Sequence, residues 1–200
     1  METKEKTSER ILKIVFKEPF SDHTASSLAK TLNISRQGVW KTLTRLLKEE
    51  IISLKSIGDT KKSTFDITLN SKNPVTAKTL SLLLEKEAVR YEKWRDNFKK
   101  IEKNTLFTIL FGSILHSPKE ANDIDLLMVV KSKQDFKDVE RSIIEAQQTQ
   151  IKKIHALDVT QEELKTELKN KNRAYIEAIK KGVVLFGQDN FIKFIMEIST

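Results

Sequence analysis

The sequence predicts an α+β protein built from two modules that a long helix connects. Apolar residues recur every three or four positions between residues 7 and 50, and again between 76 and 101, which is typical of amphipathic helices. Residues 64–69 alternate between apolar and polar types, which indicates a strand. Two short apolar runs in the second half predict buried strands of a mixed sheet flanked by helices, one of which is a polar helix over about residues 161–181. We therefore expect three parts, over residues 1–72, 73–103 and 104–200.

The composition excludes several classes of protein. The chain has 200 residues, with 36 Lys and Arg against 28 Asp and Glu, and it contains no cysteine. The lack of cysteine excludes disulfide frameworks, thiolate zinc sites and cysteine nucleophiles. No apolar run approaches the roughly 20 residues that span a bilayer. Because residues 1–10 also lack the apolar core of a signal peptide, we expect a cytoplasmic protein with no membrane partner.

The positive charge is distributed unevenly. The formal net charge is +8, and all of the excess lies in residues 1–100, whereas residues 101–200 are neutral. This asymmetry favours a basic, nucleic-acid-binding module joined to a module with a different task. The alternative is an ordinary lysine-rich surface exposed to solvent.

The first module predicts three helices in close succession. Thr7 or Ser8 can cap the first helix, and Thr24 can cap a short second helix that stops near Asn33. Ser35 can cap a third helix that runs to about Glu50. A short helix, a tight turn and a longer helix with a basic, polar outer face form a helix-turn-helix arrangement.

Two strands are expected after the third helix, at residues 52–54 and 64–69, with turn residues and a basic tip between them. Three helices followed by such a hairpin predict a winged helix. The segment Ile34–Leu43 (ISRQGVWKTL) resembles the start of the recognition helix in the N-terminal domain of the biotin repressor and related winged helices. The resemblance implies that this helix enters the major groove of DNA and that the wing contacts the DNA backbone. It assigns DNA-binding roles to Ser35, Arg36, Gln37, Lys41, Thr44, Lys61 and Lys62.

Two alternatives stay open for the first half of the chain. A winged helix can also bind proteins, and Trp40, which we place on the outer face, fits either use. Residues 73–103 are interpreted as one continuous amphipathic helix. Residues 76–101 of that helix either pack on the chain's own modules or form a homodimer that reads a symmetric DNA site.

The second module places two carboxylates at the start of a buried strand. An apolar run at residues 106–111 ends at Gly112 and Ser113, and Asp123-Ile-Asp125 then precedes a second apolar run over residues 126–130. Residues two apart in a strand project from the same face, so both carboxylates share one face. Two carboxylates beside an apolar strand indicate a site for divalent cations.

These motifs resemble the nucleotidyltransferase superfamily of DNA polymerase β, specifically its minimal prokaryotic members. The signature is Phe111-Gly112-Ser113, a nine-residue spacer and Asp123-Ile-Asp125, with Asp158 as a third carboxylate in a later strand. The resemblance implies that Gly112 and Ser113 bind the phosphates of a nucleoside triphosphate. It also implies that Asp123, Asp125 and Asp158 are catalytic and hold two Mg²⁺ ions. Asp158 has an alternative role, because it could instead cap the helix that follows it. We regard His155 as structural.

The sequence departs from the family at one point. Many minimal members place an Arg-Gly pair soon after the Gly-Ser pair, whereas this chain has no arginine in that segment. His116, Lys119 or Lys131 could take its place on the triphosphate. The leading hypothesis is a Mg²⁺-dependent nucleotidyltransferase that also binds DNA. The alternatives are a DNA-binding regulator that senses a nucleotide or partner without turnover, and an antitoxin-like enzyme that modifies a toxin.

Overall fold

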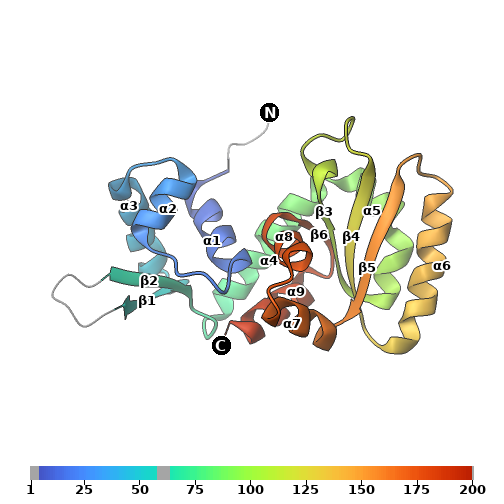
Figure 1. Cartoon of the computed structure of the whole chain (residues 1–200). Coiled ribbons are helices and arrows are strands. Elements are labelled where there is room, and N and C mark those ends of the chain that lie inside the picture. Colours follow the sequence, from blue (N-terminus) through green and yellow to red (C-terminus); the bar gives the residue numbers. More distant parts are fainter. Residues whose placement is uncertain (1–4, 58–63, 200) are drawn as a thin grey trace. The chain divides into compact units, whose positions relative to one another are not determined.

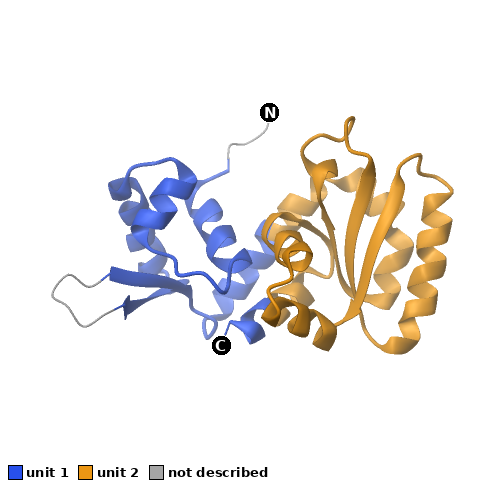
Figure 2. Ribbon diagram, in the orientation of Figure 1, with its two compact units in different colours: residues 1–83, 195–200 blue, residues 84–194 orange. Residues whose placement is uncertain are grey.

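The computed structural model describes residues 5–57 and 64–199, and its chain divides into two compact units. Unit 1 comprises residues 1–83 and 195–200, and unit 2 comprises residues 84–194 (Figure 2). The boundaries fall inside helices α4 (Pro74–Val89) and α9 (Gln188–Ile198), so the connecting segment expected over residues 73–103 is not a unit of its own. No helix in the described ranges is long and apolar enough to cross a membrane.

Unit 1 contains the predicted three helices and hairpin. Helices α1 (Thr7–Lys17), α2 (Ala25–Leu32) and α3 (Arg36–Lys48) precede the antiparallel strands β1 (Ile52–Ile57) and β2 (Thr64–Leu69) (Figure 1). All three helices and both strands contribute buried apolar residues, including Phe16, Leu28, Leu43, Ile52 and Ile67. The architecture expected for residues 7–69 is therefore confirmed.

Two of the three predicted helix caps are present in unit 1. The Thr24 Oγ1 accepts a hydrogen bond from the Ser27 amide at 3.0 Å, and the Ser35 Oγ accepts one from the Gly38 amide at 3.1 Å. The cap predicted at Thr7 or Ser8 is wrong by one or two residues. The Lys6 amide donates to the Glu9 carboxylate at 3.0 Å instead, because a glutamate three residues into a helix can reach back to the first unpaired amide.

Unit 2 is built on a four-stranded mixed sheet in the order β5-β4-β3-β6. Its strands are β3 (Thr105–Phe111), β4 (Asp123–Val130), β5 (Lys153–Thr160) and β6 (Val183–Phe186). Strand β4 is antiparallel to β3 and parallel to β5, and β6 is antiparallel to β3. Helix α6 (Phe136–Gln147), which the sequence interpretation leaves unassigned, connects the parallel pair.

Helices cover both faces of this sheet. On one face, Phe98, Ile101 and Val139 pack against Ile124 and Met128 of β4. On the other face of the sheet lie buried residues of α7 (Gln161–Lys169), α8 (Arg173–Lys181) and α9. There, the Phe107 ring contacts the Phe191 ring at a centroid distance of 5.2 Å. The mixed sheet flanked by helices is thus confirmed, while its assignment to the nucleotidyltransferase fold stays a prediction.

Two helices that the sequence predicts as continuous are broken. The helix expected over residues 73–103 becomes α4, α5 (Glu92–Asn97) and a 3-10 segment, Lys99–Asn104. The break at Arg90 and Tyr91 contains neither glycine nor proline, and the Tyr91 amide bonds to the Ala88 carbonyl, three residues back. The apolar spacing continues through the break because Tyr91, Trp94 and Phe98 pack against the core of unit 2, so periodicity alone could not reveal it.

The polar helix expected near residues 161–181 is broken at a left-handed residue. Lys171 has a φ of 55°, which ends α7, and the Asn172 side chain then caps α8 by accepting from the Ala174 amide at 3.2 Å. Asparagine is a favoured capping residue, but the residues around Asn172 are also polar. No change in hydrophobic pattern therefore marks the end of one helix and the start of the next.

Candidate functional sites

Helix α3 presents the predicted basic surface. Val39, Leu43 and Leu46 are buried on its inner side. Its exposed side carries four cations and two polar residues: Arg36, Gln37, Lys41, Thr44, Arg45 and Lys48. Because these residues cover the first three turns of the second helix of a helix-turn-helix, they form a surface suited to the phosphates and base edges of DNA.

Hydrogen bonds within the helix limit what two of these side chains can do. The Ser35 hydroxyl accepts the capping bond described above, and the Thr44 hydroxyl donates to the Trp40 carbonyl at 2.9 Å. Thr44 can therefore contact DNA only with its methyl group and its remaining lone pairs. Ser35 contributes by capping helix α3. Trp40 is half-buried, whereas we expected it on the outer face. The wing residues Lys61 and Lys62 lie outside the described residues.

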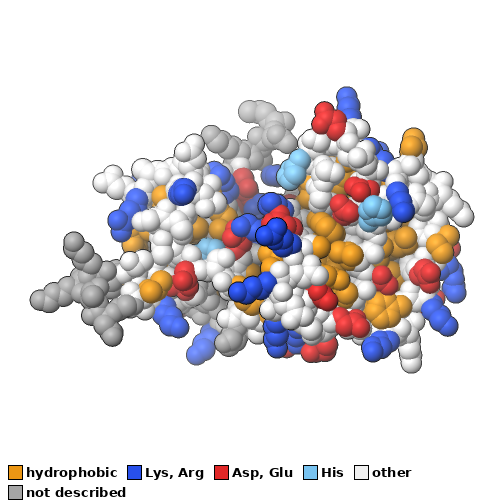
Figure 3. All heavy atoms as spheres, in the orientation of Figure 1, with side chains coloured by type: hydrophobic (Ala, Val, Ile, Leu, Met, Phe, Trp, Pro, Cys, Tyr) orange, Lys and Arg blue, Asp and Glu red, His pale blue; other side chains and the backbone are white. Residues whose placement is uncertain are grey.

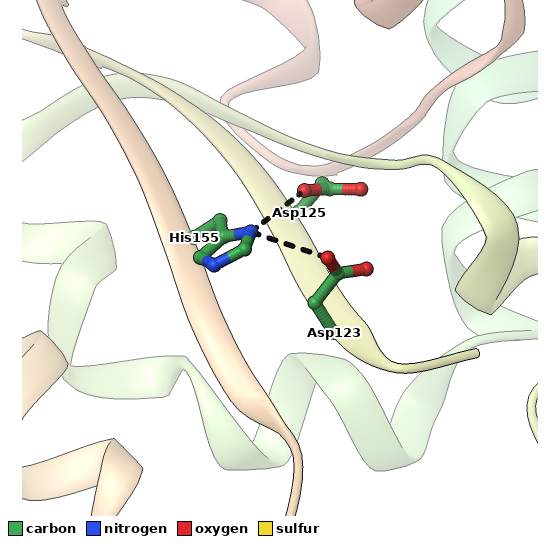
Figure 4. Close-up of side chains that lie close together, drawn as sticks. All are labelled: Asp123, Asp125 and His155. Atoms are coloured by element: carbon green, nitrogen blue, oxygen red, sulfur yellow. Dashed lines mark ion pairs between the residues drawn. The ribbon is translucent and has the colours of Figure 1, made fainter.

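Two carboxylates and one imidazole converge in unit 2. Asp123 and Asp125 project from the same face of β4, as predicted, and His155 lies beside them on β5 (Figure 4). The His155 Nδ1 is 3.2 Å from the Asp123 Oδ2 and 3.7 Å from the Asp125 Oδ1. One ligand atom of each residue lies within 4.8 Å of the others. We call these three residues the Asp-Asp-His cluster.

The cluster is open to solvent on one side. The His155 side chain is 48% exposed, that of Asp123 32% and that of Asp125 26%. Figure 3 shows acidic side chains next to a histidine on the surface of unit 2. Burial, and then the charge of Asp123, raise the pKa of Asp125, while His155 acts in the opposite direction. Two carboxylates held this close favour a positive charge beside them, which a bound metal ion can supply.

Gly112 touches the cluster from the neighbouring strand. Phe111 is the register partner of Asp125, and Gly112 follows it with a φ of 82°. A Cβ atom at Gly112 would lie 2.2 Å from the Asp125 Oδ2, so only glycine permits this approach. The structure therefore brings the Gly-Ser pair and the carboxylates of the predicted motif into one place, with Ser113 exposed at its edge.

Asp158, the predicted third carboxylate, does not join the cluster. Asp125 pairs in register with His155, whereas Asp158 pairs with Met128, three residues or about 10 Å further along the strand. Its charge acts on Tyr175 instead, where it is one of three carboxylates that, after burial, raise the pKa of the phenol. Asp158 is not the cap of α7 either, because the Thr160 Oγ1 accepts from the Glu163 amide at 3.3 Å.

His155 takes the place that we gave to Asp158. From the sequence this histidine is interpreted as structural, and no local sequence signal identifies it as a member of the cluster. In a parallel pair the residues level with a carboxylate are fixed by register, which the sequence does not show.

One of the three residues considered for the triphosphate is far away. Lys131 follows the far end of β4, about 20 Å along the strand from Asp125, and its Nζ contacts the Lys103 carbonyl. His116 and Lys119 are exposed in the segment after Gly112.

Comparison with known proteins identifies one part of the chain. The family model described as an HTH domain matches residues 7–58, about a quarter of the sequence and the part that folds as helices α1 to α3 and strand β1. No curated protein matches. The match does not extend to residues 104–200, so the nucleotidyltransferase resemblance stays a prediction.

Several solved structures resemble part of the chain weakly. The zinc-responsive MarR family member ZitR of Lactococcus lactis is 26% identical over 49% of this chain and 66% of its own, with a TM-score of 0.35. A mutant ZitR is 24% identical over 48% of this chain and 64% of its own, with a TM-score of 0.36. The adhesin competence repressor AdcR of Streptococcus pyogenes is 22% identical over 46% and 66%, with a TM-score of 0.35. Scores this low do not bear on the architecture of the chain, which contains a helix-turn-helix domain at residues 7–58.

Proposed function

We propose that this chain is a DNA-binding regulator that reads DNA with helix α3. The observation that carries the proposal is the exposed surface of α3, on which Arg36, Lys41, Arg45 and Lys48 lie within a matched helix-turn-helix domain. Cations spaced along such a helix neutralise phosphates on either side of the groove, and Gln37 near the helix start can bond to a base edge. This regulator hypothesis is better supported than the enzyme hypothesis that led the sequence interpretation.

The test measures DNA affinity and its dependence on salt. The purified chain selects sites from a random DNA library, and fluorescence anisotropy then gives its affinity at several salt concentrations. We expect Arg36→Ala with Lys41→Ala to weaken binding and to reduce the slope of log K against log salt by about 2, because each phosphate contact releases about one counterion.

The matched control removes the same two residue types elsewhere. Arg141 and Lys137 are exposed on α6 in unit 2, so Arg141→Ala with Lys137→Ala lowers the net charge equally without changing α3. Equal losses in the two double variants would mean that binding is a general charge effect. Unchanged DNA affinity in the α3 variant would show that this surface does not bind DNA and would favour a protein partner instead.

A second candidate function is nucleotidyl transfer at the Asp-Asp-His cluster. The close approach of Gly112 to Asp125 favours it, because the Gly-Ser turn and the carboxylates then line one site, as the family resemblance implies. In this reaction the acceptor hydroxyl oxygen bonds to the α-phosphorus of a nucleoside triphosphate and its proton passes to a base or to water. The bond between the α-phosphorus and the oxygen that bridges to the β-phosphate breaks, and pyrophosphate leaves with that oxygen. A divalent ion held by Asp123 and Asp125 would stabilise the charge on the phosphates.

Turnover is tested with each α-labelled triphosphate, Mg²⁺ or Mn²⁺, and DNA or a cell extract as acceptor. We expect pyrophosphate release that Asp123→Asn with Asp125→Asn abolishes, while Asp158→Asn retains it. The destination of the label separates a nucleic-acid acceptor from a protein acceptor, including a toxin-like partner. No release with any triphosphate, from protein that binds DNA, would leave the regulator alone.

A further inference from the structure

The donor atoms of the Asp-Asp-His cluster do not match the metal expected from the sequence. Three carboxylates holding two Mg²⁺ ions were expected, but the side chains that converge supply carboxylate oxygens from Asp123 and Asp125 and an imidazole nitrogen from His155. Mg²⁺ binds oxygen ligands and keeps several waters, whereas imidazole favours first-row transition ions. The mixed set of donors therefore changes which ion the site prefers.

The arrangement of these donors suits one ion. The Nδ1 of His155 lies 3.2 Å and 3.7 Å from one oxygen of each aspartate, which is close to the spacing of ligands around a single ion with bonds of about 2.1 Å. The nearest additional carboxylate considered for a second ion, Asp158, is about 10 Å further along β5. The half-exposed His155 leaves the outer side open for water or a ligand.

We propose that Asp123, Asp125 and His155 bind a single first-row transition ion, such as Zn²⁺, Co²⁺ or Mn²⁺, in preference to Mg²⁺, with the His155 Nδ1 as third ligand. The proposal concerns binding alone, so it holds whether or not the chain transfers nucleotides or binds DNA. A failure of either proposed function would leave it standing, and its own failure would leave the helix-turn-helix surface intact.

The rest of the sequence offers few competing donors. The chain has three histidines and no cysteine. His23 is buried, with its Nε2 3.0 Å from the Glu18 carbonyl, and His116 is exposed on a different segment from the cluster. A nitrogen-ligated metal that binds tightly to this chain therefore reports mainly on His155.

Calorimetric titration of the untagged, chelator-treated full chain tests the stoichiometry and the preference. We expect one equivalent of Zn²⁺, Co²⁺ or Mn²⁺ to bind, with Zn²⁺ at least about tenfold tighter than Mg²⁺. His155→Ala should remove most of that preference and leave weak, carboxylate-based binding of Mg²⁺. The control His116→Ala should bind like the unsubstituted chain. Two equivalents per chain, equal affinity for Zn²⁺ and Mg²⁺, or an unaffected His155→Ala variant would overturn the proposal.

Nuclear magnetic resonance of the same chain labelled with ¹⁵N-histidine observes the proposed ligand atom directly. Only three imidazoles contribute, and His116→Ala identifies one of them. Zn²⁺ should shift the Nδ1 signal of a single ring, which persists in His116→Ala and disappears in His155→Gln. A shift of the His116 ring, or no shift at saturating Zn²⁺, would rule out His155 as a ligand and overturn the proposal.

Discussion

Asp125 of β4 and His155 of β5 are register partners in a parallel strand pair, and the Asp125 Oδ1 lies 3.7 Å from the His155 Nδ1. The same register places Asp123 two residues earlier on the same face, where its Oδ2 lies 3.2 Å from that nitrogen. The strand pair therefore concentrates two like charges and one imidazole at the open end of β4. Such an arrangement costs stability in the metal-free protein unless a cation is present.

The first prediction concerns that cost. Asp125→Asn should raise the melting temperature of the chain in a chelator by about 2–4 °C, because the substitution removes a partly buried charge next to Asp123. The same variant should lose the rise in melting temperature that Zn²⁺ gives the unsubstituted chain. Differential scanning calorimetry with and without metal measures both effects. Asp158→Asn is the control, and a lower melting temperature for Asp125→Asn in chelator would contradict the argument.

The second prediction concerns the glycine beside the cluster. Gly112→Ala places a Cβ atom 2.2 Å from the Asp125 Oδ2 at a φ of 82°, so the carboxylate or the turn must move. We expect metal affinity to fall by about tenfold or more, comparable to the loss of a residue that orients a ligand. Gly38→Ala is the matched control, because its Cβ would meet only the Ser35 Oγ, at 3.3 Å. Titration calorimetry on both variants separates a local effect on Asp125 from a general loss of folding.

The third prediction separates capping from DNA contact at Ser35. Ser35→Ala removes the bond from the Gly38 amide and should cost about 1 kcal/mol of folding free energy, as capping residues do. Because no charge is lost, the salt slope of DNA binding should be unchanged. Ser26→Ala, at an exposed position inside α2, is the control. Denaturant titration and anisotropy together test this, and a loss of DNA affinity without any loss of folding free energy would show that Ser35 contacts DNA instead of acting through the cap.

The local signals in unit 1 were sufficient to predict its fold. Caps at Thr24 and Ser35 and the apolar spacing inside α3 are short-range features, and each lies within a few residues of what it determines. The broken helix at Arg90 shows the limit of such signals. Its apolar residues keep helical spacing on both sides, and only their packing in unit 2 favours the break.

Part of the candidate site in unit 2 also follows from local sequence signals, and part depends on tertiary structure. The pairing of Asp123 with Asp125 follows from strand alternation, and the nearness of Gly112 follows from the order of the motif. The third member depends on how β5 aligns with β4, which no residue type reveals. The family resemblance implies Asp158 as the third carboxylate, whereas the register places His155 level with Asp125.

The fourth prediction concerns self-association. The homodimer predicted through residues 76–101 stays a prediction, and α4 carries three exposed apolar residues spaced by seven: Val75, Leu82 and Val89. A spacing of seven keeps them on nearly one side of the helix. Leu82→Glu should convert a dimer of the full chain into a monomer, measured by light scattering after gel filtration. The exposed Ile144→Glu on α6 is the control, and a chain that is monomeric before substitution would refute the predicted dimer.

The fifth prediction concerns pH and the cap of α7. Hydrogen bonds from the Thr160 amide and hydroxyl to the Glu163 carboxylate hold the pKa of Glu163 below its usual value. A carboxyl whose folded pKa is lowered stabilises the protein fully above its unfolded pKa, and this contribution fades as the pH falls through the folded value. Glu163→Ala should therefore melt at a lower temperature than the unsubstituted chain at neutral pH, with a difference that shrinks as the pH falls below the usual pKa of a glutamate carboxyl. The control Glu162→Ala removes the neighbouring carboxylate, which pairs with the Lys165 side chain at 3.0 Å. A difference for Glu163→Ala that grows as the pH falls would mean that the cap acts through its neutral form.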